Sequence, residues 1–188
     1  MDIAFRPITR DDFRMIGSWF AEPLVSWWWA EDPALSAVET EYGPVVAGTD
    51  PMEVFIVVIA GREAGLIQRY RFDDEPSYAQ ELGPAVVVPP QAMSIDYLLA
   101  DEATRGSGLG TAMVGAFVER LWADHPNCPC LIVPVHADNR ASWRTLERCG
   151  FTRIAECDLE PDNPEHTPHH VIYRLDRPTR DADRALTR

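Results

Sequence analysis

The segment 93–115, MSIDYLLADEATRGSGLGTAMVG, holds the residues whose types and spacing could do chemistry. A strand-like apolar run, Ile95–Leu99, leads through a short acidic loop into the glycine-rich sequence 105–110 and then into a helix-like run from Thr111. A helix N-terminus offers free N–H groups and a positive dipole end, and glycines let the backbone approach an anion closely. The segment therefore predicts a phosphate-binding turn, although its spacing fits neither the P-loop nor the dinucleotide pattern G-x-G-x-x-G.

Asp96 is the candidate base, or the anchor for a substrate ammonium group. It interrupts the otherwise apolar strand SIDYLL. Apolar neighbours would raise the pKa of this carboxyl towards the range that a general base needs. Because side chains alternate along a strand, the alternative is an outward-facing, solvated carboxylate, which the residues alone slightly favour.

Two motifs resemble landmarks of one enzyme superfamily. The hexapeptide RGSGLG, with Arg105, Gly108 and Gly110 at the defined positions of [Q/R]-x-x-G-x-G, resembles the acetyl-CoA pyrophosphate loop of the general N-acetyltransferases (GNAT). Downstream, NRASWRTLERCGF begins at Asn139 and ends in the Gly-Phe step typical of that superfamily. The resemblance implies an α/β (α+β) fold with a mixed, mostly antiparallel sheet of about seven strands, flanked by about four helices. It also implies a V-shaped splay between the cofactor strand and the next strand.

A closer similarity, from about Phe5 to Tyr173, is to the aminoglycoside 6′-N-acetyltransferase branch. It implies that Asp96 is catalytic and that Trp28 and Tyr42 line the pocket for an aminoglycoside. It also implies acetyl-CoA as the cofactor. The resemblance implies that the backbone of Leu98, Leu99 and Ala100 binds the pantetheine arm and that Asn139 helps to bind CoA. It also implies that the pyrophosphate is bound by a run of backbone N–H groups, those of Arg105, Gly106, Ser107, Gly108, Leu109, Gly110 and Thr111.

Two positions depart from this resemblance. Many GNAT enzymes place a tyrosine, as general acid for the departing thiolate, where this chain has Leu146, next to Thr145. The branch also tends to carry an acidic residue where the strand VPVH ends in His136. We interpret His136 as a hydrogen-bonded strand-end residue rather than a base. The other histidines near it in sequence, His166, His169 and His170, are expected at the surface.

Other segments give weaker signals. Three consecutive tryptophans in VSWWWA cannot all face one core, so they either pack under a loop or form an aromatic wall. The proline-rich stretch 73–91 reads as an irregular loop flanking the acceptor site, with Asp73 as a substrate ligand. We expect a single GNAT domain over residues 1–176 and a polar tail over 177–188.

Composition limits the possible partners. The 188-residue chain has a net charge of −13, which argues against nucleic acid and favours a cationic small molecule. Its four cysteines lack a metal or redox spacing, so we expect free thiols and no metal. No apolar run is long enough for a membrane span or resembles a signal peptide, so we expect no membrane partner and a cytoplasmic monomer or homodimer.

Three functions remain after these observations. The first is acetyl transfer to an aminoglycoside amine, as in antibiotic resistance. The second is acyl transfer to a polyamine or a lysine- or siderophore-type amine. The third is a non-catalytic domain that binds acyl-CoA or a drug, which the combination of Asp96 with an intact glycine motif argues against.

Overall fold

The computed structural model describes residues 1–102 and 105–178, and it contains one seven-stranded sheet. The spatial order is β1-β2-β3-β4-β5-β7-β6, and every neighbouring pair is antiparallel except the parallel pair β4–β5. The predicted mixed, mostly antiparallel sheet is therefore confirmed. The strands are β1 (Ile3–Pro7), β2 (Glu53–Ile59), β3 (Arg62–Arg71), β4 (Met93–Leu99), β5 (Cys130–His136), β6 (Thr152–Asp158) and β7 (His169–Asp176).

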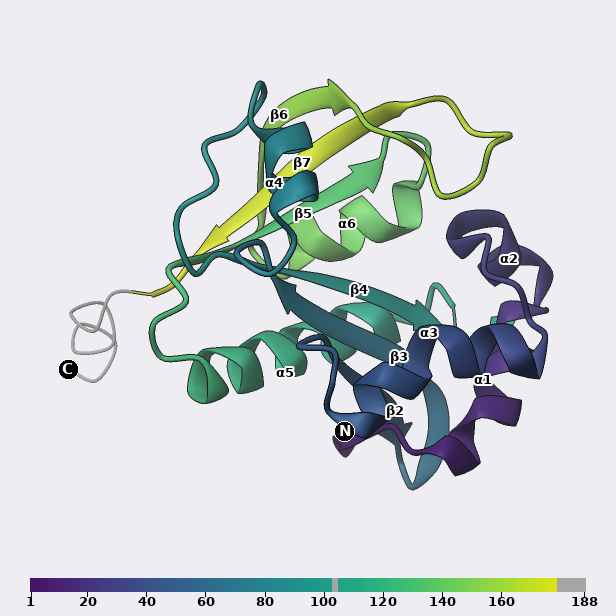
Figure 1. Cartoon of the computed structure of the whole chain (residues 1–188). Coiled ribbons are helices and arrows are strands. Elements are labelled where there is room, and N and C mark those ends of the chain that lie inside the picture. The colour runs from purple at the N-terminus through teal and green to yellow at the C-terminus, as the bar shows by residue number, and fades with distance from the viewer. Residues whose placement is uncertain (103–104, 179–188) are drawn as a thin grey trace, which may run out of the picture.

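Helices cover both faces of the sheet (Figure 1). On one face lie α5 (Leu109–Asp124) and α6 (Arg140–Arg148), and on the other lie α1 (Phe13–Phe20), α2 (Pro23–Trp29), α3 (Leu35–Ala47) and α4 (Pro76–Leu82). A 3-10 turn, Arg10–Asp12, precedes α1. The described residues thus form six α-helices rather than about four, because α2 and α4 were not predicted.

The glycine turn leads into α5, as the sequence predicts. The apolar stripe of this helix is buried against the sheet; it consists of Met113, Val114, Phe117, Val118 and Leu121. Side chains at this spacing share one helix face, so their burial fixes α5 beneath β4. The N-terminus of α5 therefore lies at the end of the strand that carries Asp96.

The strands β4 and β5 diverge, which confirms the predicted splay. They pair only at Met93 and Leu131, so the edge of β4 beyond Met93 faces a gap. On its other edge, β4 is hydrogen-bonded to β3 through even-numbered residues, since the Ala100 N–H donates to Ala64 O (2.9 Å) and the Phe72 N–H to Ala92 O (3.1 Å). In an antiparallel ladder the intervening residues point their peptide groups the other way. The N–H and C=O groups of Ile95, Tyr97 and Leu99 therefore face the gap.

The end of the sheet is anchored at Arg177. Its guanidinium donates to Cys128 O (2.7 Å) and Trp122 O (3.1 Å), and it lies over the Trp122 ring. The folded unit therefore extends one residue into the predicted tail, most of which lies outside the described residues. In the described part of the chain, no helix has the length and apolar character needed to cross a bilayer.

Candidate active site

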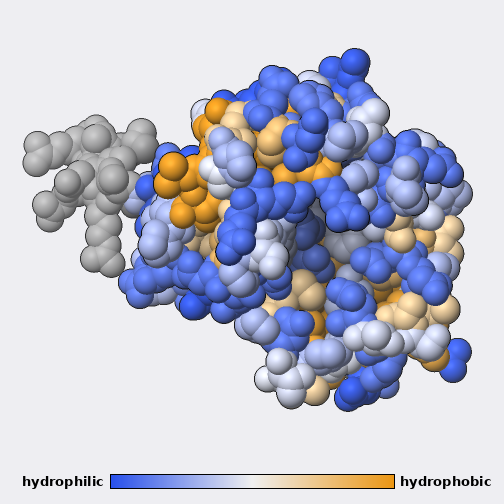
Figure 2. Space-filling view, turned by 45° about the horizontal axis from the view of Figure 1, so that its top comes forward, coloured by the Kyte–Doolittle hydropathy of each residue, from blue (hydrophilic) through white to orange (hydrophobic). Residues whose placement is uncertain are grey.

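A pocket of about 300 Å³ opens beside β4, between the α2–α3 pair and α4. Figure 2 shows a recess near the middle of this face, bordered largely by hydrophilic residues. Its aromatic lining consists of Trp28, Trp29, Tyr42, Tyr70, Tyr78 and Tyr97, and its carboxylates are Glu31, Glu41, Asp96, Glu160 and Asp162. None of the described side chains that line it is an arginine or a lysine. The pocket is therefore suited to a cationic ligand with apolar surfaces.

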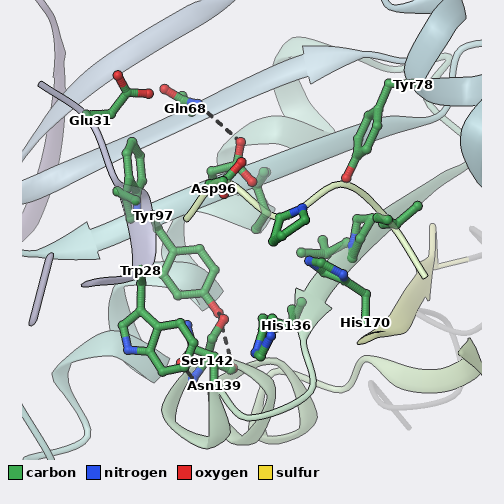
Figure 3. Close-up of a pocket in the computed structure, with 18 of the residues that line it drawn as sticks. Trp28, Glu31, Gln68, Tyr78, Asp96, Tyr97, His136, Asn139, Ser142 and His170 are labelled. Atoms are coloured by element: carbon green, nitrogen blue, oxygen red, sulfur yellow. Dashed lines mark hydrogen bonds between the residues drawn. The ribbon is translucent and has the colours of Figure 1, made fainter. Parts of the chain in front are cut away.

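Asp96 lies in this pocket and not on a solvated face. It comes from the middle of β4, and Gln68 Nε2 of β3 donates to its Oδ2 (3.1 Å; Figure 3). Desolvation raises the pKa of Asp96 to about 6, and the negative charge of Asp162 adds to this effect. Hydrogen bonds from Gln68 and Tyr70 act in the opposite direction. A carboxylate with this pKa is ionised at neutral pH, yet basic enough to accept a proton from an ammonium group.

Four further acids in the pocket were not predicted as site residues, and two of them, Glu31 and Asp162, have raised pKa values. Glu31 follows the tryptophan helix, and Asp162 lies in the turn between β6 and β7. The pKa of Glu31 is raised by burial and by the charges of Glu41 and Asp162, and burial also raises the pKa of Asp162. His136 stands where the related branch tends to have an acid, and these carboxylates supply negative charge to the pocket instead.

The three tryptophans have separate roles on α2. Trp29 stacks on Phe20 of the core (ring centroids 5.8 Å apart), and Trp28 lines the pocket. Trp27 is 42% exposed. The expectation that they could not share one core is therefore confirmed. Tyr42 of α3 lines the pocket too, although its side chain is almost fully buried against Phe20.

The histidines are distributed differently from the expectation. His136 Nδ1 accepts from the Asp138 N–H (3.2 Å), so Nε2 carries the proton and donates to Thr167 O (2.9 Å). Both ring nitrogens are occupied, as expected for a strand-end histidine that is not a base. His166 and His170 line the pocket and are not simple surface residues, whereas His169 is exposed. The turn 161–168 folds back over α2, which brings His166 to within 4.9 Å of the Trp28 ring.

Asp73 is not among the described residues that line the pocket, so the structure does not support it as a substrate ligand. It is exposed, and its Oδ2 accepts from the Gln91 N–H (2.9 Å), which closes the connection between β3 and β4. The predicted irregular loop instead contains α4, which starts at Pro76 and brings Tyr78 to the pocket. The segment does flank the pocket, but through a helix.

The glycine turn has room for a bound anion. Gly106 (φ 74°) and Gly108 (φ 88°) adopt left-handed conformations that favour glycine, and a Cβ on either would meet open space. Gly108 is the N-cap of α5, so the N–H groups of Leu109, Gly110 and Thr111 have no acceptor within the helix. The first helical turn therefore fits a phosphate group.

Three of the predicted donor-site residues are used differently. The Arg105 side chain pairs with Glu22 (2.6 Å) and donates to Leu99 O (3.2 Å), so it connects α2 with the end of β4. The Ala100 N–H and the peptide groups of Leu98 bond to β3, so these two residues cannot offer them to a donor. The groups that remain free at the gap are the N–H of Leu99, which was predicted, and the peptide groups of Tyr97, which was not.

Asn139 lies at the N-terminus of α6, at the edge of the pocket. Its Oδ1 accepts from the Ser142 N–H (3.2 Å) and caps α6, and the residue lines the pocket. Its role in binding CoA stays a prediction. Within residues 1–102 and 105–178, no group of His, Cys, Asp and Glu is arranged to hold a metal ion.

Comparison with known protein families fits this geometry. The model of the acetyltransferase (GNAT) domain matches residues 9–159. The chain belongs to this family.

Individual relatives of this GNAT domain are aminoglycoside enzymes. It is 29% identical, over 167 residues, to aminoglycoside N(6′)-acetyltransferase type 1 of Klebsiella pneumoniae and to that of Serratia marcescens, covering 86% of this chain and 79% of each relative. The crystal structure of aminoglycoside acetyltransferase AAC(6′)-Ib in complex with coenzyme A and kanamycin superposes with a TM-score of 0.77 at 26% identity, covering 94% of this chain and 95% of that one. A spermidine N-acetyltransferase chimera from Vibrio cholerae and hSSAT, 14% identical with a TM-score of 0.71 and covering 100% of both chains, shares the fold alone.

At the helix position where many GNAT enzymes have a tyrosine, this GNAT domain offers no proton donor. Leu146 is completely buried in the core between α6 and the sheet. The neighbouring hydroxyl, Thr145 Oγ1, donates to Ala141 O of its own helix (2.9 Å).

Proposed function

We infer that this protein is an acetyl-CoA-dependent N-acetyltransferase that modifies a primary amine of an aminoglycoside, and that it acts in the cytoplasm. One observation carries this conclusion. A pocket with five carboxylates and no cationic side chain among its described residues has a base-like aspartate on the strand that borders the β4–β5 gap. The relatives named for aminoglycoside N(6′)-acetylation support the same substrate class.

The donor would be held by backbone groups. The N–H groups from Leu109 to Thr111 would bind the pyrophosphate, and the peptide groups of Tyr97 and the N–H of Leu99 would pair with the pantetheine arm. Acetyl-CoA would supply an activated acetyl thioester. N–H groups that face the gap can also stabilise the negative charge that develops on a carbonyl oxygen held there.

The acceptor would be held by charge and by aromatic surface. Glu31, Glu41 and Asp162 would bind its ammonium groups, and Asp96 would accept the proton of the amine that reacts. A wide aromatic wall that includes Trp28 and Tyr78 gives more apolar contact to a ring-shaped polycation than a linear polyamine needs. This lining favours an aminoglycoside over a polyamine or a lysine-type amine.

The test is acetyl-CoA turnover, measured by thiol release, with kanamycin, spermidine and lysine as acceptors. We expect kanamycin to be the preferred acceptor, and we expect Asp96→Asn to lower kcat/KM by about 100-fold or more, the range for a general base. The matched control is Asp73→Asn, which makes the same change outside the pocket and should keep kcat/KM within about twofold.

Each contrary result has a defined meaning. Preference for spermidine or lysine would reject the aminoglycoside assignment and leave acetyl transfer intact. Binding of acetyl-CoA without turnover of any amine would favour the non-catalytic function. Equal losses in Asp96→Asn and Asp73→Asn would reject Asp96 as the base.

A further inference from the structure

The side chain of Tyr97 crosses the gap between β4 and β5. It lines the pocket directly after Asp96, and its hydroxyl reaches the first turn of α6, where it lies 3.0 Å from Ser142 Oγ and 3.2 Å from Ser142 O (Figure 3). Burial raises the pKa of Tyr97, so the phenol stays protonated at neutral pH. It is thus an O–H donor held in a fixed position.

The side chains of Asp96 and Tyr97 leave β4 on opposite faces of the sheet. Consecutive residues of a strand point to opposite faces of the sheet, so Asp96 faces the carboxylate-lined pocket while Tyr97 faces α6. The peptide group of Tyr97 itself opens into the gap between them. A thioester bound by that peptide would therefore lie between a proton acceptor on one face and a proton donor on the other.

We propose that Tyr97 is the catalytic residue that protonates the departing thiolate. This inference rests on the proposed function, because it requires an acetyl thioester in the gap. The amine nitrogen forms a bond to the carbonyl carbon and gives a proton to Asp96. The C–S bond then breaks, its electron pair stays on sulfur, and the proton of Tyr97 Oη moves to that sulfur. The phenolate regains a proton from solvent through the Ser142 hydroxyl.

The position of Ser142 favours this step. It belongs to the first turn of α6, where the helix dipole stabilises negative charge on a neighbouring phenolate or thiolate. Ser142 and Leu146 are four residues apart and so lie on one face of this helix, one turn from each other. Leu146 has no proton to donate on this helix face. The Tyr97 hydroxyl, which comes from β4, reaches the same face.

The other hydroxyl groups near the site are less well placed. Thr145 donates within its own helix, and the hydroxyl of Tyr173 donates to Glu147 Oε1 (3.0 Å), outside the pocket. The remaining pocket tyrosines come from α3, β3 and α4, on the face occupied by Asp96; they are Tyr42, Tyr70 and Tyr78.

The first test measures binding and not turnover. CoA and desulfo-CoA, which lacks the thiol, are titrated calorimetrically into the full-length wild type, Tyr97→Phe and the matched control Tyr173→Phe at a pH at which much of the bound thiol is ionised. We expect Tyr97→Phe to weaken CoA binding about tenfold, as for one hydrogen bond to a charged group, and to leave desulfo-CoA binding unchanged. Tyr173→Phe should change neither.

The second test measures turnover of kanamycin and acetyl-CoA. We expect Tyr97→Phe to lower kcat about 10- to 100-fold, near the lower end for general acids because a thiolate leaves readily, with KM for the amine unchanged. Identical behaviour of Tyr97→Phe and Tyr173→Phe would overturn the proposal. Equal losses of CoA and desulfo-CoA binding would assign Tyr97 a purely structural role. If the wild type binds neither nucleotide, the proposed function itself fails.

Discussion

The desolvation that makes Asp96 basic also destabilises the folded protein at neutral pH. Its folded-state pKa is about 6, against an ordinary value of 3.8, so the folded protein holds the proton more tightly than the unfolded chain does. Protonated Asp96 therefore contributes to the stability of the fold. This contribution is present in full below a pH of about 4 and is lost as the pH rises through about 6. Above that range, the buried carboxylate destabilises the fold.

Asp96→Asn should therefore stabilise the protein while it removes activity. At pH 7.5 we expect the free energy of unfolding to rise by roughly 1 to 3 kcal/mol, after allowance for partial solvent access. The gain should disappear near pH 4, where the native carboxyl is protonated too. Urea denaturation at the two pH values measures both quantities. A variant that is less stable at pH 7.5 would show that Asp96 gains more from its hydrogen bonds than it loses by desolvation.

At the scale of elements, α2 connects the donor turn with the acceptor pocket. Its N-terminus is capped by Glu22, which accepts from the Val25 N–H (3.1 Å) and pairs with Arg105 of the glycine turn. Near its other end, Asn163 Nδ2 donates to Trp27 O (3.0 Å). The wall that carries Trp28 is thus held by contacts at both ends of a seven-residue helix.

Glu22→Gln should loosen this wall without removing the cap, because an amide oxygen can still accept from Val25. We expect KM for the aminoglycoside to rise about three- to tenfold with kcat within about twofold, the size of one partly buried ion pair. The control is Glu39→Gln, which breaks the exposed ion pair between Glu39 of α3 and Arg10 and should change neither constant. Steady-state kinetics decides this, and equal KM values in the two variants would show that the pair does not position α2.

The elements that the sequence predicted are those with long periodic patterns. The apolar stripe of α5 and the apolar run of β4 were visible in one segment, whereas α2 and α4 have seven residues each and depend on tertiary contacts. For the same reason Tyr78 was missed.

Within the candidate site, residues in recognisable motifs could be predicted from the sequence, whereas residues in turns could not. Asp96, Trp28 and Tyr42 were predicted in the pocket and lie there, but Asp162 comes from a turn without periodicity. The peptide groups that face the gap depend on the register between β3 and β4, which the sequence of β4 does not contain. Leu98 and Ala100, which were predicted, therefore bond to β3, whereas the neighbouring Tyr97 faces the gap.

At the scale of the whole molecule, the net charge acts oppositely on the two proposed substrates. The chain has thirty acidic and seventeen basic residues, which gives a net charge of −13. This field attracts a polycationic aminoglycoside and repels the phosphates of CoA, which must be held by the local dipole of α5 and its N–H groups. Salt shortens the range of both effects, with a Debye length of about 10 Å at 0.1 M.

The two Michaelis constants should therefore respond to salt in different directions. Between about 0.05 and 0.5 M NaCl we expect KM for kanamycin to rise about tenfold, while KM for acetyl-CoA stays constant or falls. In the double variant Glu31→Gln/Asp162→Asn, the kanamycin KM should be higher and its salt dependence weaker, because two pocket charges are gone. The exposed control Glu39→Gln should keep the wild-type slope. Parallel salt slopes for the two substrates would mean that the acidic surface does not steer either of them, and that selection of the amine depends on short-range contacts in the pocket.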